Sequence, residues 1–316
     1  MNLQHHLPRP WRRSKWFWPG VALVAVAVII AIVVPLAVLL PRRNRQQQPP
    51  TNVILPLYIY PLADSSWSPV YDALSPSPPS WSTEYKSLTP DHNTRSVSRR
   101  PDLNFTVIVN PSSGPGSSPY PDAHYDAAIR RLNSYPNIET VGYVRTGYAT
   151  RNLSDVTAEV AVYSAWFSNA SALAMHGIFF DEAPHEYSPE AVEFLRAADS
   201  FVKSAPGLQG RKTIIHNPGV IPDARFNGSD VDVTVVFEET YNKWQDRSTS
   251  LAALPRTRGA YSVMVNTVPT MSNGTLSQFV NELSDLAKYV FITSLSVDFY
   301  NSFANDWLDF VGQVPA

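Results

Sequence analysis

The sequence predicts an α/β protein: a (β/α)8 TIM-type barrel preceded by a single N-terminal transmembrane helix. Three observations predict it. These are one long uncharged apolar run, a downstream alternation of short β-branched runs with amphipathic segments, and polar residues where the short runs end. Of the 316 residues 44% are hydrophobic and 16% charged, so the chain can fill a core and is not mainly disordered. The lack of cysteine excludes disulfide frameworks, thiolate metal sites and cysteine nucleophiles.

The first element is the apolar run at residues 20–40, about as long as the ~20 residues that cross a bilayer. Trp16 and Trp18 stand just before it, where an interfacial aromatic belt would lie. A cleaved signal peptide is the alternative, but its apolar part is usually ~7–15 residues and ends at a small-residue cleavage site. This run continues into Pro-Arg-Arg-Asn-Arg. We therefore expect an uncleaved membrane anchor.

The charges beside this anchor give little information on its orientation: four basic residues before the run and three after it barely favour a cytoplasmic N-terminus. The expected orientation therefore rests on glycosylation sequons. Five potential N-glycosylation acceptors follow the run: Asn104, Asn152, Asn169, Asn227 and Asn273. We expect a single-pass type II membrane protein at the cell surface. Its segments are then a cytoplasmic tail (1–19), the anchor, a stalk (41–51) and a lumenal or extracellular barrel domain (52–316).

Eight short apolar runs after the stalk are the expected strands. They are Val53–Tyr60, Phe105–Asn110, Thr140–Arg145, Gly177–Asp181, Lys212–His216, Val231–Glu238, Gly259–Asn266 and Tyr289–Val297. Amphipathic segments between them are the expected helices: Ala123–Asn133, Ser154–Phe167, Pro189–Lys203 and Thr275–Lys288. The first and fifth connections lack a helical pattern, and Ser65–Pro101, rich in Ser and Pro, is expected to be a long loop or a decorated crossover. An open doubly wound sheet is the rival fold, but no Gly-rich nucleotide fingerprint follows the first strand.

Carboxylates stand at the ends of two expected strands. Asp181 and Glu182 follow Ile-Phe-Phe, and Glu238 and Glu239 follow Val-Val-Phe, although strand interiors are depleted in acids. Barrel active sites lie at the C-terminal ends of strands, so two acidic pairs there predict acid/base chemistry of the kind that glycoside hydrolases use. Adjacent strand residues face opposite ways, so one acid of each pair is expected at the site and the other in support. Strand-end ion pairs are the alternative.

Other strand ends supply the expected substrate-binding residues: Tyr58, Asn110, Tyr143, Arg145, His216, Asn217, Glu239 and Asn266. For His216 the alternative is a buried histidine satisfied by a neighbour. No cofactor and no metal are expected, because His185 near the acids lacks the two-histidine spacing of zinc hydrolases.

The charge distribution argues against a nucleic-acid partner. The first 50 residues hold seven basic residues and no acid, so the rest carries 18 basic and 27 acidic residues, a net charge of −9. Nucleic-acid binders need a basic surface instead. We expect a monomer whose partners are a polysaccharide substrate and, through residues 20–40, a membrane.

Two motifs carry a family resemblance: Asn110-Pro-Ser-Ser-Gly-Pro-Gly after the second expected strand and Gly177-Ile-Phe-Phe-Asp-Glu-Ala-Pro at the fourth. Both closely resemble the spherulin-4 family, over about residues 52–312. That family includes fungal (β/α)8 glycoside hydrolases that cleave α-1,4-linked N-acetylgalactosamine in the exopolysaccharide galactosaminogalactan. The resemblance implies the same fold and activity, a substrate rich in N-acetylgalactosamine, and catalytic carboxylates at Asp181, Glu182 and Glu238.

The resemblance implies a retaining endo-cleavage. In an α-linked N-acetylgalactosamine the 2-acetamido group lies on the same face as the leaving oxygen and cannot attack from behind, so an enzymic carboxylate must serve if configuration is retained. The sequence leaves open which of Asp181 and Glu182 attacks; we assign Asp181 as nucleophile and Glu238 as general acid/base. Their carboxyl groups should then lie ~5–5.5 Å apart, against ~6.5–9.5 Å for inversion. A catalytically idle carbohydrate-binding or wall/spore structural protein, or a hydrolase of a different glycan, are the alternatives.

Overall fold

The computed structural model describes residues 50–63, 65–74, 100–226, 228, 230–254 and 257–316. The expected anchor at 20–40, its cytoplasmic tail and nearly all of the stalk lie outside these residues. Within the described ranges, no helix combines the length and the apolar character needed to cross a bilayer.

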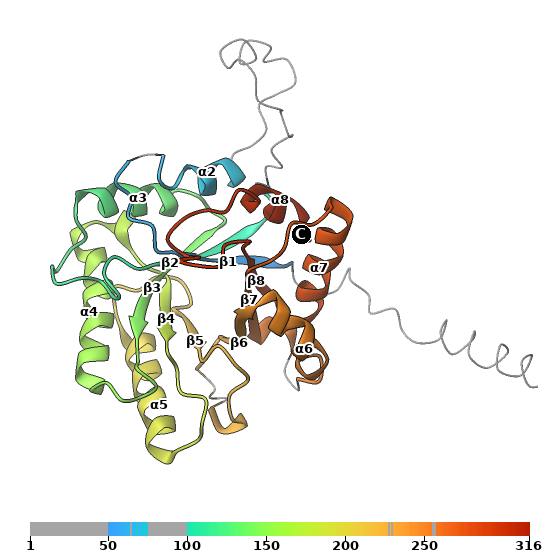
Figure 1. Ribbon diagram of the computed structural model, residues 1–316. Coiled ribbons are helices and arrows are strands. Elements are labelled where there is room, and N and C mark those ends of the chain that lie inside the picture. Colours follow the sequence, from blue (N-terminus) through green and yellow to red (C-terminus); the bar gives the residue numbers. More distant parts are fainter. Residues whose placement is uncertain (1–49, 64, 75–99, 227, 229, 255–256) are drawn as a thin grey trace, which may run out of the picture. The chain divides into compact units, whose positions relative to one another are not determined.

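Eight parallel strands form one closed barrel in chain order (Figure 1). The strands are β1 Asn52–Leu57, β2 Asn104–Val109, β3 Ile138–Arg145, β4 Gly177–Asp181, β5 Thr213–Asn217, β6 Val233–Thr240, β7 Tyr261–Asn266 and β8 Tyr289–Ile292. Each strand pairs with the next, and β8 closes the ring against Asn52 and Val53 of β1. Closure leaves no unpaired strand edge. The predicted barrel is confirmed, and the open doubly wound sheet is excluded.

The predicted strands are all present, and two of them end three or more residues earlier than expected. β1 stops at Leu57 because the Tyr58 N–H donates to the carbonyl of Tyr300, at 3.2 Å, in place of a ladder partner. β8 stops at Ile292 rather than Val297, and the chain then turns through exposed residues to Asp298, whose φ is +47°. Both early ends free a segment to run across the mouth of the barrel.

Helices surround the barrel as expected; four of them match the predicted segments, and the described residues form three more. They are α2 Ser68–Leu74, α3 Ala123–Asn133, α4 Leu153–Asn169, α5 Pro189–Ser204, α6 Tyr241–Leu251, α7 Asn273–Leu286 and α8 Trp307–Gln313. Side-chain caps start several of them; Ser188 accepts from the Ala191 N–H ahead of α5, whose first residue is proline. The fifth connection holds only the short 3-10 turn Ala224–Phe226, as predicted. In the first connection, α2 is a helix that the sequence pattern did not predict; residues 75–99 of that connection lie outside the described ones.

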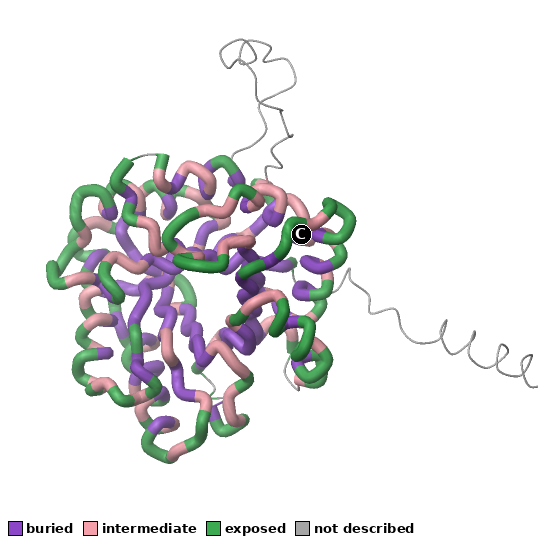
Figure 2. The backbone as a smooth tube through the Cα atoms, in the orientation of Figure 1, coloured by how far each residue is buried: buried purple, intermediate pink, exposed green. Residues whose placement is uncertain are grey.

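The core lies inside the strands and between the strands and helices, so the strands are buried and the outer faces of the helices are exposed (Figure 2). One close approach explains a glycine in β3. A Cβ at Gly142 would lie 2.7 Å from the ring of Tyr163, a fully buried residue of α4. Glycine therefore lets α4 pack directly on the strand.

The N-terminal ends of the strands are closed by hydrogen bonds between side chains. Thr213 donates to Glu139 across the barrel and accepts from Arg211, which also reaches the hydroxyl of Tyr289. Arg258 donates to the hydroxyl of Thr51 just before β1. The C-terminal segment ends at the same face, where the carbonyl of Val314 accepts from Arg100 at 2.6 Å. Both ends of the described barrel thus lie opposite the mouth.

Candidate active site

Strand alternation aims two polar side chains into the mouth at one level. Asp181 of β4 and Asn217 of β5 are partners in the parallel register, and both are the last residues of their strands. Residues one position earlier, Phe180 and His216, face the helices instead and contact each other with ring centroids 5.9 Å apart. The period of two in a strand therefore decides which residue of each neighbouring pair reaches the mouth.

Asn217 joins two carboxylates. Its Nδ2 donates to Asp181 Oδ1 at 2.8 Å and to Glu238 Oε2 at 2.5 Å, while its Oδ1 accepts from the Gly219 N–H at 3.0 Å. Both amide hydrogens and the amide oxygen are thus engaged, which fixes the orientation of the amide. Since the two bonds share one nitrogen, the two oxygens can be no farther apart than the sum of the two bond lengths, about 5.3 Å, which is below the ~6.5–9.5 Å of inverting glycosidases.

Glu238 reaches this point through an irregularity in β6. The register of β6 against β7 shifts between Val235 and Phe237, which marks a β-bulge, and bulges re-aim side chains at barrel rims. Glu238 Oε1 accepts from the hydroxyl of Tyr300 at 2.5 Å. Burial raises the pKa of Glu238, the charge of Asp181 adds to the rise, and the hydrogen bonds from Tyr300 and Asn217 oppose it. This carboxyl therefore tends to hold its proton to higher pH than an ordinary glutamic acid.

Asp181 has a fixed donor on each oxygen. Asn217 occupies Oδ1, and the hydroxyl of Tyr143 donates to Oδ2 at 2.7 Å. Burial, followed by the charge of Asp181, raises the pKa of Tyr143 well above its ordinary value, so its hydroxyl stays a donor at all physiological pH values. The ring of Tyr58 lies edge-on to Tyr143 and to Tyr300, with centroids 5.5 Å and 5.3 Å away, and so contacts both rings whose hydroxyls bind the acids.

Glu182 stands beside this pair in an unusual backbone conformation. Its φ is +49°, and its carbonyl accepts from the Tyr148 N–H at 2.6 Å and the Thr146 hydroxyl at 2.7 Å. Its carboxylate lies 3.6 Å from Arg145 Nη1, and both side chains are partly exposed at the mouth. Asp181 and Glu182 therefore point in different directions, as expected from their adjacency.

His216 corrects a prediction. Its side chain faces α5, is only 4% exposed, and its Nε2 lies 2.8 Å from Asp199 Oδ1. The ring lies on the opposite face of β5 from Asn217, so it has no path to a substrate in the mouth. His216 is therefore a buried histidine with a hydrogen-bond partner, Asp199, which is the alternative stated in the sequence analysis.

Three other expected binding residues have different surroundings from those predicted. Glu239 is exposed, and its carboxylate accepts from the N–H of Thr240, so the acid next to Glu238 faces away from the cluster. Asn110 accepts from the Gly114 N–H at 3.0 Å and so holds the loop after β2. Asn266 is 7% exposed and accepts from the hydroxyl of Thr267. These amides organise the loops of the mouth, and their hydrogen bonds lead to no acid of the cluster.

Tyr300 is the residue that sequence reasoning missed. It lies in the loop between β8 and α8, and its partner Glu238 is 62 residues away in the chain. The sequence did carry a signal, because a loop that follows the eighth strand must also open at the mouth. The predicted strand to Val297 concealed it by extending β8 through the start of that loop.

The sequons differ in accessibility. Asn152, Asn169 and Asn273 are exposed, whereas Asn104 is half-buried as the first residue of β2, with Thr106 of its sequon fully buried. Asn227 lies outside the described residues.

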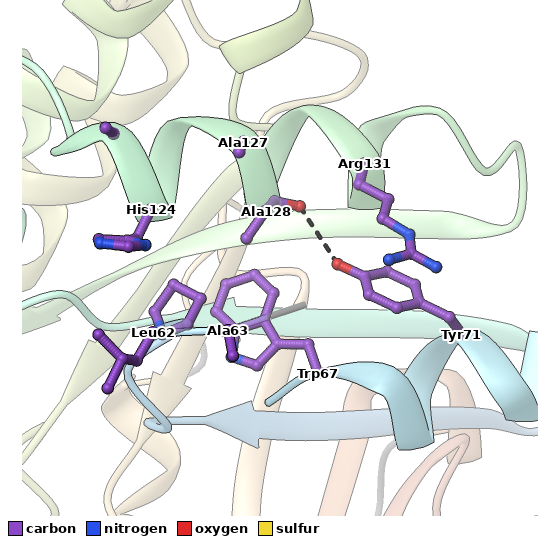
Figure 3. Close-up of a pocket in the computed structure, with 10 residues that line it drawn as sticks. Leu62, Ala63, Trp67, Tyr71, His124, Ala127, Ala128 and Arg131 are labelled. Atoms are coloured by element: carbon purple, nitrogen blue, oxygen red, sulfur yellow. Dashed lines mark hydrogen bonds between the residues drawn. The ribbon is translucent and has the colours of Figure 1, made fainter. Parts of the chain in front are cut away.

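A pocket of about 120 Å³ lies apart from the acids, between α3 and the segment joining β1 to α2 (Figure 3). His124, Ala128 and Arg131 line it from α3, with Trp67 and Tyr71 opposite. Its walls are bonded to each other: the Tyr71 hydroxyl reaches the Ala128 carbonyl, and the Arg131 guanidinium lies 3.7 Å from the centre of the Tyr71 ring. It contains no residue of the acid cluster. Across the described ranges, no group of three or more His, Asp or Glu side chains is placed to hold a metal ion.

Comparisons with known proteins cover the whole barrel. The family model described as spherulation-specific family 4 (Spherulin4) matches residues 52–314. Spherulin-4 of Physarum polycephalum is 25% identical over 241 residues, which are 74% of this chain; the chain spans 60% of that relative's length. A crystal structure of Aspergillus clavatus Sph3 in complex with GalNAc matches with a TM-score of 0.74 and 36% identity, over 85% of this chain and 98% of that one.

Proposed function

Because the chain belongs to the Spherulin4 family, we propose that it is a glycoside hydrolase whose mouth carboxylates cleave an α-1,4-linked N-acetylgalactosamine polymer with retention of configuration. One observation carries the proposal: a single amide, Asn217, holds Asp181 and Glu238 within about 5.3 Å of each other. An inverting enzyme needs a wider gap that admits water between the acid and the reacting carbon.

The two carboxyl groups take different roles because their surroundings differ. Glu238, with its raised pKa, is protonated at the start and donates to the leaving glycosidic oxygen. Asp181, whose two oxygens accept hydrogen bonds from Tyr143 and Asn217, attacks the anomeric carbon. The bond to the leaving oxygen breaks as the bond to Asp181 forms, which gives a covalent glycosyl-enzyme intermediate.

The second step reverses the role of Glu238. As a carboxylate it takes a proton from water, the water attacks the anomeric carbon, and Asp181 leaves with its original charge. The donors from Tyr300 and Asn217 favour the carboxylate form of Glu238, so they assist the first step, in which Glu238 gives up its proton. Glu182 and its partner Arg145 line the site beside Asp181 and bind sugar hydroxyls.

The substrate class is supported by Sph3, which was crystallised with GalNAc and is 36% identical to this chain. The acetamido argument then requires an enzymic nucleophile, which Asp181 supplies. Galactosaminogalactan is the polymer that we propose. We also propose that residues 20–40 anchor the enzyme in a membrane, with the barrel on the lumenal or extracellular side.

The test is hydrolysis of purified galactosaminogalactan by the full-length chain, followed by release of reducing ends. We expect activity in the wild type, and its loss in Asp181→Asn and Glu238→Gln. Glu239→Gln is the matched control, because it makes the same change one residue away on a side chain that faces out of the site. Nuclear magnetic resonance of the first product should show the α anomer. A β anomer would disprove retention, and equal activity in Glu238→Gln and Glu239→Gln would remove Glu238 from the mechanism.

A further inference from the structure

Exposed rings gather on one face of the barrel. Nine large apolar side chains are exposed in the described residues, and seven of them lie on loops that follow strands. The other two, Phe167 and Phe201, lie on the outer helices α4 and α5. Since loops after strands form the mouth, the exposed apolar surface is concentrated around the acids.

Four of the seven are tyrosines on four successive loops. Tyr60 follows β1, Tyr120 follows β2, Tyr148 follows β3 and Tyr187 follows β4, and each is between 41% and 55% exposed. These four strands are neighbours in the closed barrel. The described parts of the loops after β6 and β7 carry no large exposed apolar side chain. The rings therefore occupy one side of the mouth.

Two of these rings, Tyr60 and Tyr187, are held in place by their neighbours. Tyr60 donates its hydroxyl to Asp122 at 3.0 Å. Tyr187 is covered on one face by the guanidinium of Arg225, 3.3 Å from the ring centre, and Arg225 is itself bound to Asp223 at 2.7 Å. Orientation that is fixed in advance lowers the entropy lost when a ligand stacks on a ring.

Tyr148 links this row to the acids. Its N–H donates to the Glu182 carbonyl, and Gly147, Tyr148 and Ala149 all have left-handed φ values of +60°, +54° and +64°. Strained backbone of this kind persists where the surroundings hold it, and it occurs at functional sites. Burial raises the pKa of Tyr148, and Glu182, Asp181 and Glu238 add to the rise, so the ring lies within the field of all three acids.

We propose that Tyr60, Tyr120, Tyr148 and Tyr187, here called the tyrosine row, bind several successive sugars of the polymer on one side of the cleaved bond. The inference rests on the proposed function for the identity of the polymer. Pyranose rings present C–H groups that stack on aromatic faces, and a galactose-configured ring, with its axial 4-hydroxyl, gathers these C–H groups on one face. The asymmetry of the row means that more sugars are bound on one side of the acids than on the other.

The experiment measures binding, so that it does not depend on cleavage. The full-length Glu238→Gln chain is titrated calorimetrically with an α-1,4-linked N-acetylgalactosamine trimer and with a long oligomer. We expect Tyr120→Ala and Tyr187→Ala to weaken binding of the long oligomer about fivefold to tenfold and binding of the trimer much less, and Tyr120→Phe, which keeps the ring, to restore the ratio. Phe201→Ala removes an equally exposed ring outside the mouth and is expected to leave the ratio unchanged.

An unchanged long-to-short affinity ratio in the two tyrosine variants, or an equal effect of Phe201→Ala, would overturn the tyrosine row. Failure of the parent chain to bind either oligomer would overturn the proposed occupant. Hydrolysis of the polymer by the wild type is measured separately and tests the proposed function. If the wild type cleaves the polymer but the tyrosine variants bind it normally, only the tyrosine row is rejected.

Discussion

The two ends of the barrel are built from the same strands but differ in how their polar groups are paired. At the N-terminal end, Glu139, Arg211 and Thr213 satisfy one another by hydrogen bonds. At the mouth, two carboxylates share one donor, and of the seven non-glycine residues with positive φ in the described part of the chain, six lie on the loops that follow strands. The exception, Lys212, precedes β5. One end therefore stabilises the fold, while the other holds charge and backbone strain that reduce stability and permit chemistry.

β5 allows the sharpest test of this contrast, because it contributes a residue to each end. Asn217→Ala at the mouth removes the donor shared by Asp181 and Glu238, and we expect kcat to fall about 10²–10³-fold, as when one donor of a preorganised site is lost. The substitution also leaves Asp181, Glu238 and the Gly219 N–H without this partner, so we expect the free energy of unfolding to fall by about 1–3 kcal/mol as well, and the contrast with the other end lies in kcat. Hydrolysis rates and thermal unfolding of the same preparation check both expectations. A large loss of stability with unchanged kcat would reverse the contrast.

At the other end of the same strand, Thr213→Val keeps the shape of the side chain but leaves Glu139 and Arg211 without its hydroxyl. We expect a loss of about 1–3 kcal/mol in the free energy of unfolding, because buried polar groups lose a partner. The kcat/KM should stay within about twofold of wild type. Denaturant titration and steady-state kinetics measure the two quantities, and a drop in kcat comparable to that of Asn217→Ala would show that the ends are coupled.

Tyr300→Phe sharpens the description of the mouth. The Tyr300 hydroxyl lowers the pKa of Glu238, so its removal should raise that pKa further above the ordinary value. Activity that needs protonated Glu238 is lost as pH rises through this pKa, and the alkaline limb of the pH profile should therefore move to higher pH. The kcat should fall about tenfold, because the carboxylate formed in the first step loses a donor. Movement of the limb to lower pH would contradict the assignment of Glu238 as the acid.

The smallest expected effect concerns the cost of holding Glu238. Its pKa in the folded chain is above the value of 4.5 for a free side chain, so rising pH removes its proton from the unfolded chain first and stability falls across the interval between the two pKa values. Glu238→Gln removes this penalty. We expect its melting temperature to exceed that of wild type by about 2–4 °C at neutral pH, with no gain below about pH 4. Melting curves over pH test this, with Glu239→Gln as the control that should show no gain.

Much of the fold could be predicted because its signals are local. The run Gly177–Asp181 has the predicted bounds, since glycine and a pair of acids enclose three large apolar residues that suit a buried strand. The helix Ala123–Asn133 also has both predicted bounds, because Asp122 caps it and its apolar residues repeat at helical spacing. The first crossover was predicted less well, since a short helix in a Ser- and Pro-rich segment depends on packing against α8 rather than on its own pattern.

The sequence predicts which strand ends carry site residues, but not which of two adjacent residues at a strand end points into the mouth. Asp181 and Glu238 were identified from acids at strand ends, but His216 and Asn217 are adjacent, and only the observed register shows which one faces the mouth. A bulge in β6 likewise affects which of the adjacent residues Glu238 and Glu239 faces the mouth. Tyr300 depends on how a loop crosses the barrel, which no local pattern encodes.

The positions of the two chain ends have a practical consequence. Thr51 enters the barrel and Val314 leaves it at the face opposite the acids. A support, a fusion partner or a reporter joined to the barrel directly at Thr51 or Val314 would therefore face away from incoming polymer. Coupling through an end should preserve turnover on a long polymer, whereas coupling through an engineered lysine on a loop after a strand should block it.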